Sequence, residues 1–282
     1  MPMTQRSLAC LNPRGFHTIA YTEWGAPDRP ALVCVHGMTR NARDFDMLAA
    51  ALEGSWRVVC PDVAGRGSSD WLPDHHDYGY PQYLADMTAL IARLDVESVD
   101  WVGTSMGGLI GMMLAAQPNT PVRRLVINDI GPFIPKAFLA RLREYVGKAP
   151  RFPDRNALEA YLRQVHETFG PLEGSQWRHL AEHSARPLAD GGFGLAYDPA
   201  IGRAAFADDE PADFDAWDVW DRVACPVLVL RGARSDLLLP ETVQQMTQRG
   251  PGCDVKEIAG CGHAPALMDA AQIALIRNWL DR

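Results

Sequence analysis

A serine between two glycines is the feature of this sequence best suited to chemistry. The run Gly103-Thr-Ser105-Met-Gly107 lies between an apolar strand-like segment and an apolar helical one. A serine on such a sharp turn stands clear of the sheet, and the glycines let strand and helix pass closely without Cβ clashes. The pattern predicts that Ser105 is a nucleophile. The alternative is a serine that only caps the helix, which the candidate partners below disfavour.

A serine hydroxyl needs a base to take its proton before it can attack. His263 lies in the glycine-rich loop Gly260-Cys-Gly-His-Ala-Pro265, directly before the last helical run. Such a loop can reach across the top of a sheet, so we predict that His263 is the base. Solvated or packing roles are expected for the histidines of a polar loop and of helical segments, namely His75, His76, His166, His179 and His183.

The base in turn needs a carboxylate that orients its ring. Asp236 follows the apolar run 226–230 and precedes His263, giving the chain order serine, aspartate, histidine. Asp129, in the segment Ile127-Asn-Asp-Ile-Gly131, ends an earlier strand at the same sheet edge and is the rival candidate. We favour Asp236 as the carboxylate and expect Asp129 to hold loops through backbone hydrogen bonds.

Two backbone N–H groups would complete the site by stabilising a developing oxyanion. The loop His36-Gly37-Met38-Thr39 ends the first buried strand, which suits the N–H of Met38 as one donor. Met106, the residue after the nucleophile, would supply the second N–H. The side chain of His36 is expected to shape the loop and not to act as the base.

Short apolar segments alternate with helical patterns through most of the chain. Unbroken β-branched runs predict buried strands, because both of their faces need cover. The predicted strands are 31–35, 56–60, 99–102, 125–127 and 226–230, and the predicted helices are 44–53, 82–94 and 105–117. This alternation predicts an α/β fold with a mostly parallel central sheet and helices on both faces.

One long segment interrupts the alternation. From about 133 to 209 no strand candidate occurs, whereas apolar residues recur at helical spacing. We predict that 133–209 is a helical lid inserted between two strands of a core formed by 1–132 and 210–282. The glycine-rich stretch 187–202 is expected to be irregular lid structure.

Composition limits the partners of the chain. The net charge is −8 without a basic patch, which argues against nucleic acid. No apolar run is long enough to span a membrane, and the first residues contain no continuous apolar segment typical of a secretory signal, so we expect a cytoplasmic location. The six cysteines contain no Cys-x-x-Cys pair, which predicts buried reduced thiols and neither a zinc nor a dithiol redox site. Oligomeric state has no signal in the sequence.

These motifs together resemble the α/β-hydrolase superfamily, over nearly the whole chain beyond the first dozen residues. The run Pro61-Asp-Val-Ala-Gly-Arg-Gly-Ser-Ser69 is similar to its D-x-x-G-x-G-x-S turn, in which the aspartate is structural. Ser105 stands where dehalogenases and epoxide hydrolases of the superfamily carry an aspartate nucleophile. The loop His36-Gly37-Met38-Thr39 departs from the His-Gly-Gly-Gly loop of some of its lipases.

The resemblance implies a hydrolase of a small-molecule carboxylic ester or lactone, acting through an acyl-enzyme on Ser105 without a metal or organic cofactor. A second hypothesis is a carbon–carbon bond hydrolase of ring-fission acids, although such relatives often carry tryptophan where Ala264 stands. A third is a receptor that binds its ligand on this fold without turnover. Arg40 and Arg43 could bind an acidic substrate group, but solvated charges on a helix are the interpretation that we favour.

Overall fold

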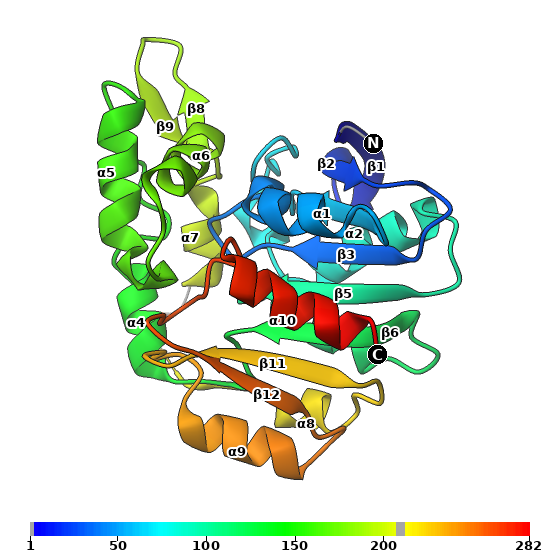
Figure 1. Cartoon of the computed structure of the whole chain (residues 1–282). Helices are drawn as coiled ribbons and strands as arrows, with labels where there is room; N and C mark the ends of the chain where they lie inside the picture. Colours follow the sequence, from blue (N-terminus) through cyan, green and yellow to red (C-terminus); the bar gives the residue numbers. More distant parts are fainter. Residues whose placement is uncertain (1–2, 207–211) are drawn as a thin grey trace.

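One mixed sheet organises the computed structural model of this protein, which describes residues 3–206 and 212–282. Its eight strands are β1 (Thr4–Asn12), β2 (Gly15–Trp24), β3 (Ala31–Val35), β4 (Arg57–Pro61), β5 (Val99–Thr104), β6 (Val122–Asn128), β11 (Val227–Gly232) and β12 (Asp254–Ile258). They lie in the order β1-β2-β4-β3-β5-β6-β11-β12 (Figure 1). All pairs from β4 to β12 are parallel, whereas β1 pairs antiparallel with β2 and β2 with β4.

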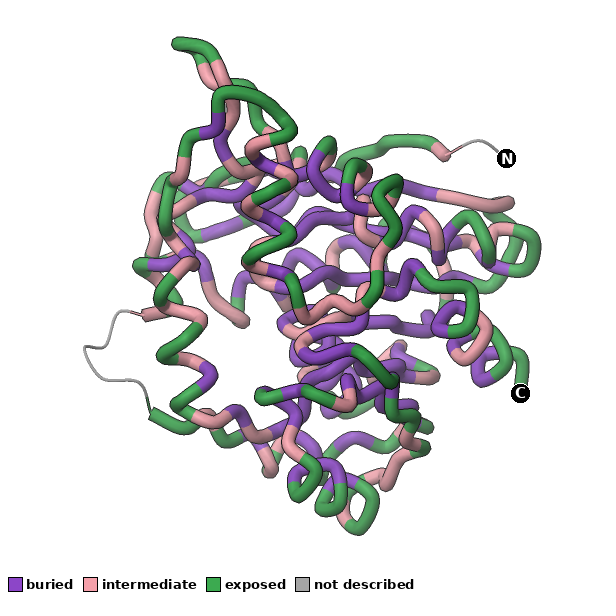
Figure 2. The backbone as a smooth tube through the Cα atoms, turned by 60° about the vertical axis from the view of Figure 1, so that its left-hand side comes forward, coloured by how far each residue is buried: buried purple, intermediate pink, exposed green. Residues whose placement is uncertain are grey.

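Helices cover both faces of the sheet because its inner strands are apolar on both sides. In β3, Val33 and Val35 enter one apolar cluster, and Leu32 and Cys34 enter another on the opposite face. The first cluster includes residues of α2 (Tyr80–Arg93), α3 (Met106–Ala115), α8 (Trp217–Trp220) and α9 (Pro240–Gln248), and the second those of α1 (Asp46–Leu52) and α10 (Ala270–Leu280). Figure 2 shows the central strands as the buried part of the chain. The predicted fold class is confirmed.

Three strands of the sheet were not predicted from the sequence. β1 and β2 form an antiparallel hairpin at one edge, and β12 is the strand at the other edge. Most residues of β1 and β12 are exposed or half-buried, so neither strand has an unbroken apolar run. Edge strands of this kind are stabilised by pairing with a neighbouring strand, and a hydrophobic pattern in the sequence does not indicate such pairing.

A helical insertion lies between β6 and β11, as predicted. It contains α4 (Lys136–Arg143), α5 (Arg155–Val165), α6 (Gly174–Ser184) and α7 (Ala200–Ala205), all gathered past one end of the sheet (Figure 1). Leu158 and Leu162 of α5 pack with Trp177 and Leu180 of α6 in an apolar cluster of their own. Within the described residues, no helix combines the length and the apolarity needed to cross a membrane.

The expectation of an insertion without strands is wrong. Its start, β7 (Phe133–Ile134), pairs antiparallel with β10 (Phe214–Asp215), and β8 (Ala185–Pro187) forms a hairpin with β9 (Phe193–Leu195). Gly191 and Gly192 adopt positive φ angles in the turn of this hairpin, where the sequence suggested irregular structure. These strands are too short to show a period of two. The predicted boundary at 209–210 lies outside the described residues.

Candidate active site

Ser105 occupies a strained turn between β5 and α3. Its φ of 52° and ψ of −118° lie in a region that residues with a side chain seldom adopt. A Cβ added to Gly103 would lie 2.2 Å from the carbonyl oxygen of Gly107, and one added to Gly107 would lie 2.0 Å from that of Val35. Only glycine allows strand and helix to approach so closely, so the predicted strand–turn–helix context of the motif is confirmed.

A hydrogen-bonded series runs from this serine through a histidine to a buried carboxylate. The Nε2 atom of His263 lies 2.9 Å from Oγ of Ser105, and its Nδ1 atom lies 2.9 Å from Oδ2 of Asp129. The hydroxyl of Thr168, from the insertion, donates to the carbonyl oxygen of His263 at 2.6 Å. The structure therefore brings Ser105 and His263 together as the sequence predicted, with Asp129 as the third member.

Asp129 directly follows β6, and its side chain is fully buried. Oδ1 accepts a hydrogen bond from the N–H of Gly232 at 2.7 Å, and Oδ2 accepts one from the hydroxyl of Ser235 at 2.7 Å. A buried carboxylate is costly without such donors. Asp129 thus holds the loop after β11, as expected, and also contacts the imidazole of His263, which was not expected.

The prediction that Asp236 is the carboxylate beside His263 is wrong. The Asp236 side chain is 53% exposed and forms an ion pair with Arg141 of α4 at 2.8 Å. Both aspartates follow parallel strands, so chain order did not distinguish them. The usable signal was their distance from the strand: Asp129 is the first residue after β6, whereas Asp236 lies beyond a turn that follows β11.

The predicted oxyanion loop lies beside the serine. A Cβ added to Gly37 would lie 3.7 Å from Cβ of Ser105. Met106 is the first residue of α3, and the leading N–H groups of a helix have no acceptor within it and carry its positive dipole end. Met38 and Met106 line the same cavity as Ser105.

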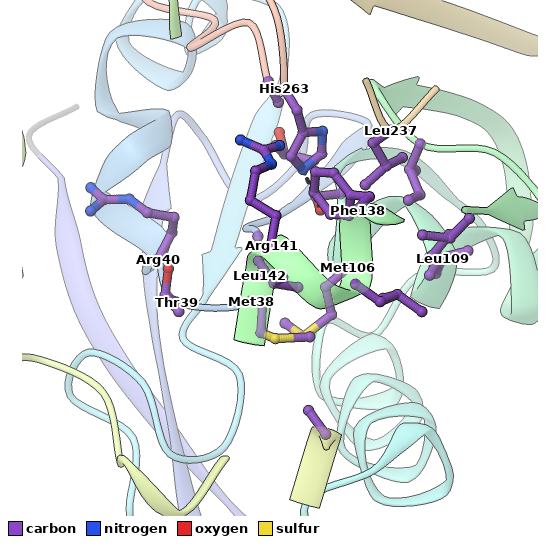
Figure 3. A pocket seen from close by; sticks show the side chains of 18 of the residues that line it. Met38, Thr39, Arg40, Met106, Leu109, Phe138, Arg141, Leu142, Leu237 and His263 are labelled. Carbon is purple, nitrogen blue, oxygen red and sulfur yellow. Dashed lines mark hydrogen bonds between the residues drawn. The ribbon is translucent and has the colours of Figure 1, made fainter. Parts of the chain in front are cut away.

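That cavity has a volume of about 270 Å³ and lies between the carboxyl ends of the central strands and the insertion. Most of its wall is apolar, formed by side chains such as Met38, Leu109, Phe138, Leu142 and Leu237 (Figure 3). The ring of Phe138 packs edge-on against the imidazole of His263, with centroids 5.0 Å apart. The catalytic candidates therefore face a space suited to aliphatic groups.

The model of the alpha/beta hydrolase family matches residues 32–275 of this chain. The chain belongs to this family. A 3-hydroxybutyrate-oligomer hydrolase of Cupriavidus necator is 48% identical over 94% of both chains. A putative hydrolase of Rickettsia typhi has a TM-score of 0.92 at 32% identity, with 100% of this chain and 99% of that chain covered. An alpha/beta hydrolase of Novosphingobium aromaticivorans has a TM-score of 0.87 at 34% identity, with 99% and 98% covered.

In this α/β hydrolase, the buried side chain of His36 supports the candidate oxyanion loop. Its Nδ1 atom lies 2.7 Å from the carbonyl oxygen of Gly37, and its Nε2 atom lies 3.0 Å from the backbone nitrogen of Val63. Burial lowers the pKa of His36 to about 3, so the ring is neutral, with Nδ1 donating and Nε2 accepting. The expectation that His36 shapes this loop is confirmed.

The D-x-x-G-x-G-x-S turn of the hydrolase holds the same loop from the other side. Asp62 accepts hydrogen bonds from the N–H groups of Ala42 and Ser68, while burial raises its pKa to about 6. Arg66 is almost fully buried and donates from Nε to the carbonyl oxygen of Met38 at 2.8 Å. The turn thus fixes the peptide that follows the candidate oxyanion donor, the N–H of Met38.

The two arginines after the candidate oxyanion loop, Arg40 and Arg43, both form ion pairs. Arg40 is only 5% exposed, binds Asp44 and donates to the hydroxyl of Ser184, so the expectation of a solvated charge is wrong for it. Arg43 is partly exposed and forms an ion pair with Asp46. Arg40 reaches the cavity wall, but its charge is already neutralised by Asp44.

Proposed function

We propose that this α/β hydrolase cleaves short aliphatic carboxylic esters, with oligomers of 3-hydroxybutyrate as its substrate class, through an acyl-enzyme on Ser105. The observation that carries the proposal is the series Ser105–His263–Asp129 at the wall of an apolar cavity. The substrate class is supported by the 48% identity to the 3-hydroxybutyrate-oligomer hydrolase over 94% of both chains.

The reaction starts when Nε2 of His263 takes the proton of Ser105 and Oγ attacks the ester carbonyl carbon. The N–H groups of Met38 and Met106 stabilise the oxyanion of the tetrahedral intermediate, each contributing roughly 3 kcal/mol. The carbon–oxygen bond of the ester then breaks, and the alcohol leaves with the proton from His263. Water, deprotonated by His263, attacks the acyl-enzyme and releases the acid together with free Ser105.

Asp129 keeps His263 ready for both proton transfers. Its Oδ2 atom accepts the hydrogen bond of Nδ1–H, which leaves the lone pair of Nε2 directed at Ser105. The negative charge also stabilises the imidazolium that forms in each transition state. Ser235 and Gly232 donate hydrogen bonds to the carboxylate, so they hold it in place beside the imidazole.

The insertion at 133–209 acts in this proposal as a lid. Phe138 and Leu142 of α4 form part of the cavity wall, and Phe138 lies against His263. A cover of apolar side chains excludes water, which strengthens the electrostatic interactions at the reacting carbonyl. It also selects for aliphatic acyl groups that can replace the water of the cavity.

The proposal is tested with the purified full chain and the dimer and trimer of 3-hydroxybutyrate, by chromatographic measurement of the monomer released. We expect turnover that falls by a factor on the order of 10⁶ in Ser105→Ala, because no nucleophile remains. Ser175→Ala, at an exposed serine of α6, is the matched control and should leave turnover unchanged.

Two results would contradict the proposal. Retention of more than a few per cent of turnover in Ser105→Ala would show that another group attacks the ester. Cleavage of a ring-fission acid together with inactivity towards every ester tested would favour a carbon–carbon bond hydrolase on the same three residues.

A further inference from the structure

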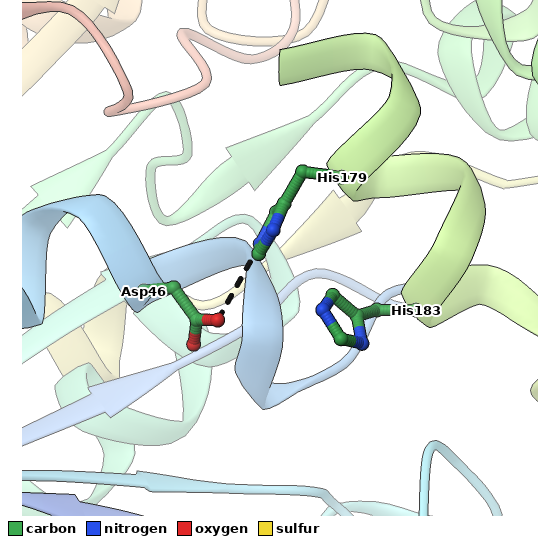
Figure 4. A group of neighbouring side chains, drawn as sticks. All are labelled: Asp46, His179 and His183. Atoms are coloured by element: carbon green, nitrogen blue, oxygen red, sulfur yellow. Dashed lines mark ion pairs between the residues drawn. The ribbon is translucent and has the colours of Figure 1, made fainter. Parts of the chain in front are cut away.

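Three side chains suited to a metal ion lie outside the cavity, where the insertion meets the core. His179 and His183 are one turn apart on α6, which places both imidazoles on one face of the helix. Asp46, the first residue of α1, faces them from the core (Figure 4). One ligand atom of each residue lies within 4.8 Å of those of the other two.

The spacing of these atoms suits a tetrahedral ion after a small adjustment. Nε2 of His179 lies 3.5 Å from Oδ2 of Asp46. Two ligands bound to Zn²⁺ at tetrahedral angles lie about 3.4 Å apart, so this pair already has the required separation. The ring of His183 lies 4.6 Å from that of His179, centroid to centroid, and a side-chain rotation would bring it to the third position.

The positively charged guanidinium of Arg43 contacts two of these three side chains. Its Nε atom donates to Oδ2 of Asp46 at 2.8 Å, and its Nη1 atom lies 3.4 Å from Nδ1 of His183. Because a guanidinium can only donate hydrogen bonds, Nδ1 of His183 is the acceptor in this contact and carries the lone pair that a metal ion would share. The Arg43 side chain is 28% exposed, which leaves it a path into solvent.

We propose that Asp46, His179 and His183 bind one divalent transition-metal ion of the Zn²⁺ type, which replaces the guanidinium of Arg43 and links α6 to α1. Two imidazoles and one carboxylate favour such an ion over Mg²⁺ or Ca²⁺, which prefer oxygen ligands. His179 currently contacts the carbonyl oxygen of Arg43 through Nε2 at 2.9 Å. On binding, the ring proton moves to Nδ1 and this hydrogen bond is exchanged for the metal bond.

The bound ion would restrain the insertion against the core. α6 supplies Trp177 and Leu180 to the apolar cluster of the insertion. At the end of the same helix, Ser184 accepts a hydrogen bond from Arg40, which lines the cavity. A metal link between α6 and α1 therefore resists any movement that lifts the insertion from the cavity, and it stabilises the folded state by mass action.

The test uses the full chain, freed of metal by a chelator and then titrated with Zn²⁺ in competition with a chromogenic chelator. We expect one ion per chain, a rise in Tm on binding, and slower proteolytic cleavage within 174–184. His179→Ala and His183→Ala should each weaken binding at least 10-fold and abolish the rise in Tm. Arg43→Gln should tighten binding, because it removes the competing cation while leaving all three ligands.

The matched control is the partly exposed group of Asp74, His75 and His76, which has a similar set of ligand atoms. Combined His75→Ala and His76→Ala should leave the affinity for Zn²⁺ unchanged. Loss of binding in this variant, or full binding in both His179→Ala and His183→Ala, would overturn the proposal. So would a Co²⁺ complex with a thiolate charge-transfer band, since it would place the ion on cysteine sulfur.

Discussion

The buried carboxylate of Asp129 has two structural tasks in addition to the hydrogen bond with His263. It accepts the N–H of Gly232 and the hydroxyl of Ser235, and both donors come from the loop that follows β11. Asp129 therefore holds in place the loop that carries Asp236, the other candidate for the carboxylate. Asp129, the carboxylate nearer to a strand end, can be buried because the N–H of Gly232, the hydroxyl of Ser235 and the imidazole of His263 all contact it.

Asp129→Asn and Asp236→Asn distinguish the two aspartates in the reaction. An asparagine at 129 can present an N–H to Nδ1 and stabilise the wrong tautomer of His263, so we expect turnover to fall about 10⁴-fold. It should also lower the free energy of unfolding by about 1–3 kcal/mol, through mismatched buried donors. Asp236→Asn should leave turnover within a few-fold, because it removes only an exposed ion pair. A larger loss of kcat in Asp236→Asn would refute the assignment.

The buried side chain of His36 should make the free energy of unfolding depend on pH. Its native pKa of about 3 lies below the ordinary value of about 6.5, so only the unfolded chain gains a proton as the pH falls between these values. The contribution of His36 is complete above pH 6.5 and is lost towards pH 3, at about 1.4 kcal/mol per pH unit. From pH 7 to pH 5 the loss from this residue amounts to about 2 kcal/mol.

The measurement is urea unfolding of the native chain and of His36→Gln at both pH values. Glutamine can donate to Gly37 and accept from Val63 without titrating, so its stability should decline less in acid. His76→Ala, at an exposed histidine, is the control that should keep the native slope. Identical slopes for His36→Gln and the native chain would show that His36 is not the group responsible.

At the scale of elements, the site depends on how closely α3 crosses β5 and β3. The backbone of Gly107 faces the carbonyl oxygen of Val35, and that of Gly103 faces Gly107. This contact places the start of α3, with Met106, beside the loop that follows β3. Both candidate oxyanion donors can take up their positions because Gly103 and Gly107 have no side chains.

Gly107→Ala tests this contact. The added Cβ would lie 2.0 Å from the carbonyl oxygen of Val35, so helix and strand must separate. We expect a loss of about 1–3 kcal/mol in the free energy of unfolding and a loss of activity as the oxyanion donors move. Gly54→Ala, where a Cβ would meet nothing within 4 Å, is the control for stability and kcat. An unchanged kcat in Gly107→Ala would contradict the role of the close crossing.

At the scale of the whole molecule, the two ends of the sheet have different tasks. Ser105, Asp129 and His263 lie beyond the carboxyl ends of β5, β6 and β12, on the side of the sheet where the insertion lies. Near the opposite end, the fully buried side chain of Asp100 pairs with Arg123 and Arg124. Arg124 also lies over the ring of Trp56 at 5.5 Å.

Asp100→Asn should lower stability without affecting the reaction. It leaves Arg123 and Arg124 beside a neutral side chain, so we expect a loss of about 3 kcal/mol in the free energy of unfolding, measured with urea. The kcat of the folded enzyme should be unchanged, since the change lies at the far end of β5. Asp190→Asn, in the exposed pair with Arg151, should leave the free energy of unfolding nearly unchanged. A fall in kcat without a change in stability in Asp100→Asn would contradict the assignment of stability to this end of the sheet and of the reaction to the other.

The sequence by itself determined the fold class, the turn at Ser105, the loop of His263 and the position of the candidate oxyanion loop. Each of these depends on local features: apolar runs that need cover on two faces, glycines at a close crossing, and a histidine in a glycine-rich loop. Such features act over a few residues, so their meaning is readable from neighbours in the chain.

Only the tertiary structure decided which aspartate meets His263, where the edge strands pair, and that β8 and β9 form a hairpin. Asp129 and Asp236 both follow strands, and their difference is that Gly232, Ser235 and His263 converge on only one of them. That convergence joins three segments far apart in the chain. Burial of a charge is favourable only where such distant donors meet, and no local pattern records where they will meet.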